Sequence, residues 1–187
     1  MLLLYALVFN FLFCSCGSFN EPISRENKLN LNATNLNQFD GKYKRLSTTY
    51  EDGPNFYCEF NDSFKCFYLW KGKKLMNASV TENDFLELEV IDKTNIKVSF
   101  VLNGKIEKSK ILKGKLTENT FVFNSRNFLI PLVLINYGER HITRISLSEK
   151  GNLNIDAYQF ALANFFIFPW TSGQYEVYNL EFEKIRE

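Results

Sequence analysis

Two cysteines are the side chains of this sequence best placed for chemistry. Cys58 and Cys66 lie in two aromatic-rich runs, NFYCEF and FKCFYLW, separated by the turn-forming residues Asn61-Asp62-Ser63. A three-residue loop would place the cysteines opposite each other on neighbouring strands, where a modest adjustment brings their Cβ atoms within disulfide distance. We expect a structural disulfide between them, with two buried free thiols as the alternative.

The other reactive residues form no recognisable catalytic motif. His141 is the only histidine, and a single histidine on a strand is more often a hydrogen-bonded structural residue than a base. Glu87 and Glu89 share one face of the run FLELEVI, about 7 Å apart, but alternating charge on a solvent-facing strand explains them better than paired catalytic carboxylates. The sequence therefore predicts no enzyme, no metal site and no cofactor.

Composition points to one folded domain that does not bind nucleic acid. The chain has 187 residues and a formal net charge of +1, and its basic residues form no stripe. With 19 Phe and 9 Tyr, it has ample apolar surface for a core and is too aromatic for a disordered chain.

The first residues have the pattern of an export signal. Residues 1–13 (MLLLYALVFNFLF) are too short to span a bilayer as a helix, which needs about 20 residues, and have the length of a signal-peptide core. The following FCSCG resembles a bacterial lipobox, which implies a signal peptide over residues 1–15 and an acylated, palmitate-type anchor on Cys16. By resemblance to the sorting of enterobacterial lipoproteins, Gly17 in place of Asp favours the outer membrane of the cell envelope. A plain secretory signal and an uncleaved apolar N-terminus are the alternatives.

The remaining chain divides into a linker and a β domain. Residues 16–37 are polar and Asn-rich, which predicts a flexible tether, and residues 38–187 form the domain. Short runs rich in Val, Ile, Phe, Tyr and Thr alternate with turn signals, the spacing of an all-β barrel or sandwich. Ten strands are expected, at residues 42–50, 55–60, 64–71, 85–91, 95–102, 105–116, 120–135, 141–148, 153–168 and 174–185.

Two hairpins have a definite predicted register. A type I′ turn at Asn103-Gly104 pairs Phe100 with Glu107 and Val98 with Ser109, so either polar groups face the interior or a bulge shifts the second strand.

A three-residue loop at Glu149-Lys150-Gly151 pairs Leu147 with Leu153, Ile145 with Ile155, Thr143 with Ala157 and His141 with Gln159. This places His141 and Gln159 at the far end of the inward face.

Residues 160–170 (FALANFFIFPW) are apolar apart from one asparagine. A strand buried on both faces is the expected explanation, and an edge that contacts lipid or a partner is the alternative.

The start of the first predicted strand resembles a known family. The sequence Gly41-Lys42-Tyr43 is similar to the G-x-W motif of lipocalins, and the leader is similar to that of small lipocalin-like lipoproteins of Gram-negative bacteria. The resemblance implies an antiparallel up-and-down barrel of about 8–10 strands, with a β-sandwich as the alternative. It also implies that Tyr43 plugs the closed end, that Gly41 allows a tight approach, and that the last strand closes onto the first.

Two functions follow from this fold. The first is an envelope lipoprotein that binds a small hydrophobic molecule, with Glu107, Ser109, His141 and Gln159 as polar orienters in the barrel mouth. The second is a non-catalytic structural or interaction subunit of an envelope complex. An internal cavity would favour the first, and an exposed apolar patch on a filled barrel would favour the second.

Overall fold

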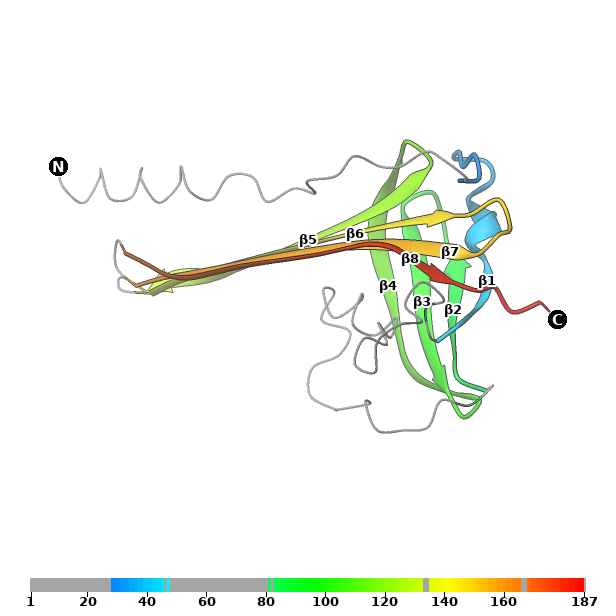
Figure 1. The fold of residues 1–187 in the computed structure, drawn as a ribbon, viewed down its shortest axis with the longest axis horizontal. Helices are drawn as coiled ribbons and strands as arrows, with labels where there is room; N and C mark the ends of the chain where they lie inside the picture. The colour runs from blue at the N-terminus through cyan, green and yellow to red at the C-terminus, as the bar shows by residue number, and fades with distance from the viewer. Residues whose placement is uncertain are drawn as a thin grey trace.

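The computed structural model describes residues 28–45, 47, 81, 83–132, 135–165 and 168–186. In these ranges the chain is all-β, as predicted, with one short 3-10 helix (Figure 1). The elements are η1 (Leu36–Phe39), β1 (Gly41–Lys44), β2 (Phe85–Val90), β3 (Asn95–Leu102), β4 (Lys105–Thr117), β5 (Thr120–Leu132), β6 (Ile135–Leu147), β7 (Leu153–Phe165) and β8 (Phe168–Phe182).

The eight strands form one antiparallel sheet in which each strand pairs with the next along the chain. The sheet curls into a nearly closed barrel, because residues just after β8 return to β1: the backbone N–H of Lys44 donates to the carbonyl of Glu183, and that of Ile185 donates to the carbonyl of Lys42. This is the up-and-down barrel expected from the sequence, with the C-terminal segment lying against the first strand.

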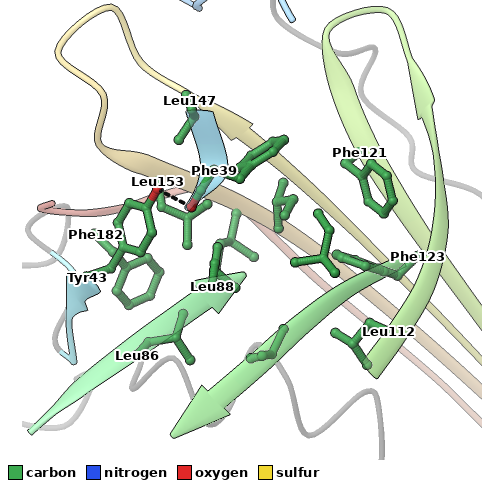
Figure 2. Close-up of a cluster of buried hydrophobic side chains, with 14 of the residues drawn as sticks. Phe39, Tyr43, Leu86, Leu88, Leu112, Phe121, Phe123, Leu147, Leu153 and Phe182 are labelled. Carbon is green, nitrogen blue, oxygen red and sulfur yellow. Dashed lines mark hydrogen bonds between the residues drawn. The ribbon is translucent and has the colours of Figure 1, made fainter. Parts of the chain in front are cut away.

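One continuous cluster of apolar side chains fills the barrel where its strands converge (Figure 2). The alternation of apolar residues along each strand sends one face of every strand into this cluster. Its largest members are fully or almost fully buried: Phe39, Tyr43, Leu86, Leu88, Phe121, Phe123, Leu147, Leu153 and Phe182. The interior between these strands is therefore occupied by the chain's own side chains.

Part of the predicted tether belongs to the packed domain. Leu31 and Leu36 are each 3% exposed within the core cluster, and the Leu29 N–H donates to the carbonyl of Leu147. Leu36 and Phe39 lie three residues apart on η1, so one side of this short helix covers the end of the barrel. The predicted flexible tether was wrong for residues 28–37. Its leucines are too widely spaced to show the periodicity of a helix or strand, so no pattern in the sequence indicated packing.

The β3–β4 hairpin contains the bulge that sequence reasoning left open. Leu102 pairs with Lys105 as predicted, but the register shifts between Phe100 and Val101, so Phe100 pairs with Lys108 and Ser99 with Ser109. Glu107 and Ser109 are exposed. The bulge alternative is therefore confirmed, and the inward position of these two polar residues as ligand-orienting groups is wrong, because one extra residue on a strand exchanges its two faces.

The β6–β7 hairpin has the predicted register throughout. The pairs Leu147–Leu153, Ile145–Ile155, Thr143–Ala157 and His141–Gln159 are all present. Gly151 adopts a φ of +81°, the left-handed conformation that the three-residue loop requires.

The barrel opens between β4 and β5. The two strands pair over only four residues each, from Gly114 to Thr117 and from Thr120 to Phe123. A Cβ atom on Gly114 would lie 2.4 Å from the ring of Phe121 and 2.6 Å from the Val122 carbonyl oxygen, so this close approach requires glycine. Beyond this corner β4 continues along β3, whereas β5 continues along β6.

Strands β5 to β8 are far longer than the barrel needs. Each has at least 13 residues, or about 43 Å, and together they project from the barrel as a four-stranded sheet (Figure 1). We call the projecting part, residues 124–132, 135–142, 157–165 and 168–177, the arm. The predicted strand at residues 153–168 is in fact two strands, since β7 ends at Phe165 and β8 begins at Phe168.

Several predicted features lie outside the described residues. These are the signal peptide, the anchor at Cys16, the cysteine pair Cys58 and Cys66, and the strands expected at residues 55–60 and 64–71. Within the described part, β1 ends at Lys44 rather than residue 50, and β6 begins at Ile135 rather than residue 141.

Candidate functional site

The far end of the arm brings together two apolar segments that are distant in sequence. The first consists of residues 128–132 and 135, at the end of β5 and the start of β6. The second consists of residues 165 and 168–170, at the end of β7 and the start of β8. They are side by side, because Ile135 pairs with Phe165 and Phe165 with Phe168. Residues 127–138 and 157–175 contain no charged residue. We call the strand ends Phe128–Leu132, Ile135, Phe165 and Phe168–Trp170 the arm tip.

The outer strands of the arm are edge strands. Beyond Phe123, β5 pairs with no described strand on its outer side, and β8 has a described neighbour there only at residues 183–185, directly after its end. Both edges carry a proline at a register shift near the tip, Pro131 in β5 and Pro169 in β8. Proline removes a ladder donor and a bulge bends the strand, and proteins use both to prevent pairing between edges.

The base of the arm holds a buried ion pair. Arg144 Nη2 and Nε lie 3.0 Å and 3.1 Å from Asp156 Oδ2, with both side chains under 10% exposed. Asp156 Oδ1 also accepts the Asn179 N–H at 2.9 Å, where Asn179 has a φ of +55° in a bulge of β8. All residues from His141 to Leu147 are buried, so both faces of β6 are covered at this level.

A second buried ion pair lies directly before the start of β2. Arg45 Nη1 donates to Asp84 Oδ2 at 3.2 Å, and the side chains are 0% and 3% exposed. Asp84 also accepts hydrogen bonds from the backbone and hydroxyl of Thr81 and from the N–H of Asn103. Burial alone would raise the pKa of Asp84, but these donors outweigh it, and the pKa lies below its usual value.

The four predicted ligand-orienting residues do not converge. His141 is 2% exposed on β6 and is the register partner of Gln159 on β7. Glu107 and Ser109 are exposed on β4, and the Ser109 hydroxyl lies 3.1 Å from that of Ser99. Strands β4 and β6 are not neighbours in the sheet, so the set splits into two separate pairs.

Gly41 and Tyr43 lie where the barrel closes. Tyr43 is fully buried, and its hydroxyl donates to the carbonyl of Phe39 at 2.9 Å (Figure 2). Gly41 has a φ of +143°, and a Cβ atom there would lie 2.6 Å from Lys184 Cε. Burial raises the pKa of the Tyr43 phenol. Both residues thus support the joint between β1 and the C-terminal segment.

An open groove follows this joint, lined by Lys44, Glu181, Glu183 and Arg186 among others. Several of its polar side chains have partners within the chain: Lys44 pairs with Glu183, and Glu181 accepts a hydrogen bond from Asn152. The groove offers a ligand no unsatisfied buried group.

Sequence reasoning missed both ion pairs and the arm. The predicted register of the β6–β7 hairpin already placed Arg144 opposite Asp156, so that pair was available from the pattern. Arg45 and Asp84 are 39 residues apart in the sequence, so no local pattern pairs them. The arm escaped notice because an apolar run has the same composition in a core strand as in a projecting hairpin.

Comparison of the chain with protein-family models, with curated proteins and with solved structures found no match. Among the described residues, no helix is long and apolar enough to cross a membrane. The described residues also contain no group of three or more His, Cys, Asp or Glu side chains placed to hold a metal ion.

Proposed function

We propose that this chain is a non-catalytic interaction protein of the bacterial cell envelope. In this proposal an acylated Cys16 anchors it, the barrel is a scaffold, and the β5–β8 arm contacts the partner. The observation that carries the proposal is the arm itself, four strands that continue beyond the core to two adjacent apolar ends. Apolar surface that no described element covers is costly to keep in water unless it binds something.

The alternative proposal, a carrier of a small hydrophobic molecule, has less support. A carrier needs internal volume, and the core cluster occupies the barrel between its described strands. Two of the residues proposed to orient a ligand, Glu107 and Ser109, are also exposed on β4. Native mass spectrometry of the purified chain tests the carrier directly: a non-covalent passenger of defined mass would favour it over our proposal.

Site-specific photo-crosslinking tests the interaction function. A benzoylphenylalanine residue replaces Phe128 or Phe168 in the full chain, expressed in a bacterial envelope, and replaces Ile111 in the control. Ile111 is a matched position, because it is 57% exposed on β4 and lies in the barrel wall. We expect discrete adducts from the two arm positions and none from Ile111. Equal labelling at all three positions, or none at the arm, would refute an arm-based function.

A further inference from the structure

Polar and apolar residues are separated along the length of the arm. Next to the barrel its strands carry polar residues, among them Ser125-Arg126-Asn127 on β5 and Glu139-Arg140 on β6. Beyond Phe128 on β5, the residues as far as Ile135 are all apolar. On the neighbouring strands this level corresponds to Gly138 and Leu162, since Phe128 pairs with Gly138 and Gly138 pairs with Leu162. Two positions further along, Asn136 pairs with Asn164.

The apolar tip occupies both faces of the sheet. Successive residues of a strand belong to opposite faces, and Phe128 to Leu132 are consecutive apolar residues. A groove on a protein partner covers one face of an added sheet, whereas a lipid bilayer surrounds the tip on every side. We propose that the arm tip inserts into a phospholipid bilayer, an inference that rests on the proposed function and names its partner.

Residues that favour the membrane interface lie at the end of the tip nearer the barrel, close to the level of Phe128. Trp170 occupies the bulge position of β8, and Tyr137 lies opposite Leu129 on β6. Tryptophan and tyrosine concentrate at the level of lipid headgroups. Arg126 and Arg140 are register partners two positions before Phe128, so two guanidinium-bearing residues share one face at the level of the phosphates.

The edges of the arm limit how deeply it enters. An open sheet edge cannot cross the hydrocarbon core, because its backbone groups would find no partner there. Five residues, from Phe128 to Leu132, span about 16 Å, roughly half of the ~30 Å core. Pro131 and Pro169 each remove one edge donor. The tip therefore enters one leaflet only.

A second copy of this chain fits the tip less well than lipid does. Copies would join through the edges of β5 and β8, and both edges carry the prolines and register shifts that oppose such pairing. This argues for a partner that needs no backbone ladder, which is a property of lipid.

The test reads the environment of Trp170 in the full chain. Changing Trp70→Phe leaves Trp170 as the only tryptophan. The chain is mixed with vesicles of phosphatidylethanolamine and phosphatidylglycerol that carry a spin label high or low on the acyl chain. We expect a blue shift of the emission and stronger quenching by the label nearer the headgroup. The inference would be overturned if the protein sedimented with the vesicles but its Trp170 emission did not change. Stronger quenching by the label deep in the acyl chains would also overturn it.

A pair of matched variants separates the tip from any other membrane contact. In a Cys16→Ser background, which removes the acylation site, Phe128→Ser with Phe168→Ser should weaken vesicle binding at least ~100-fold, because two phenylalanines leave the lipid. Ile106→Ser with Ile111→Ser, at exposed apolar positions of β4, should leave binding unchanged. Equal binding by both variants refutes insertion of the tip, and equal thermal melts show that both fold.

The two proposals fail in different ways. Protein adducts at Phe128 together with an unquenched Trp170 would leave the interaction function standing and remove the bilayer as its partner. Adducts of twice the chain mass would identify a second copy instead. No arm-specific adduct and no quenching would remove both proposals.

Discussion

Replacing Asp84 by alanine should be among the most destabilising single changes in the barrel. Arg45 and Asp84 bury their side chains almost completely against each other, at 0% and 3% exposure. Removing one partner of a buried ion pair leaves the other charge without compensation and costs about 3–5 kcal/mol. The N–H groups of Thr81 and Asn103 lose their acceptor as well.

Urea unfolding of the Asp84→Ala variant, followed by intrinsic fluorescence, measures this cost. For a domain of this size, a loss of about 3–5 kcal/mol corresponds to a fall in Tm of roughly 6–20 °C. The exposed pair of Lys97 and Glu89 is the control, and Glu89→Ala should leave the unfolding midpoint nearly unchanged. A loss below about 1 kcal/mol in Asp84→Ala would refute the reasoning.

A double variant separates the unpaired charge from the general effect of mutating the site. Arg45→Met with Asp84→Leu removes both charges and keeps apolar volume, and such replacements are often neutral. We expect the double variant to be more stable than Asp84→Ala alone. If the double variant is less stable than Asp84→Ala, the ion pair itself contributes net stability. The loss in Asp84→Ala would then not be caused by an uncompensated charge on Arg45.

The low pKa of Asp84 sets the pH dependence of this contribution. A carboxyl group whose folded pKa lies below its unfolded value stabilises the fold fully above the unfolded value, near 4. The stabilisation is lost as the pH falls through the folded pKa. The free energy of unfolding should therefore decline below about pH 4, and Asp84→Asn should make this decline shallower. Identical acid limbs in the two proteins would contradict the assignment.

Three further substitutions test the joints of the barrel by the same unfolding measurement. Gly114→Ala should cost about 1–3 kcal/mol, because its Cβ would overlap the ring of Phe121; no loss would mean that the corner relaxes freely. Gly104→Asn should be nearly neutral, since nothing lies within 4 Å and asparagine tolerates a φ of +73°. Tyr43→Phe should cost about 0.5–1.5 kcal/mol, because its hydroxyl bonds the Phe39 carbonyl; a neutral result would make this bond unimportant.

Local signals explain which parts of the fold could be predicted. The β6–β7 hairpin was predicted residue by residue, because Gly151 selects the loop and the apolar faces match on both strands. The β3–β4 hairpin had an equally clear turn at Asn103-Gly104, but no turn signal or apolar pattern in the sequence marks the bulge at Glu107.

Non-local geometry explains what could not be predicted. The ion pair of Arg45 and Asp84 joins segments with no shared period, so nothing in the sequence places them together. Residues 160–170 satisfied every criterion for a buried strand, and only the pairing of β5 to β8 reveals a hairpin at the end of a projecting sheet. Of the predicted site, the neighbouring positions of His141 and Gln159 could be derived, since both lie in the predictable hairpin.

Strands β5 to β8 use their apolar residues differently at the barrel and in the arm. This difference supports our proposal that the arm has a function of its own. At the barrel, Ile145, Leu153 and Phe182 are fully or almost fully buried and contribute to stability. In the arm, the same strands continue through polar residues to an apolar tip, whose register partners all lie within β5 to β8. A segment that adds apolar residues without extending the core raises the risk of aggregation and gains no core packing in return. This contrast is the physical ground for our proposal that the arm binds a partner.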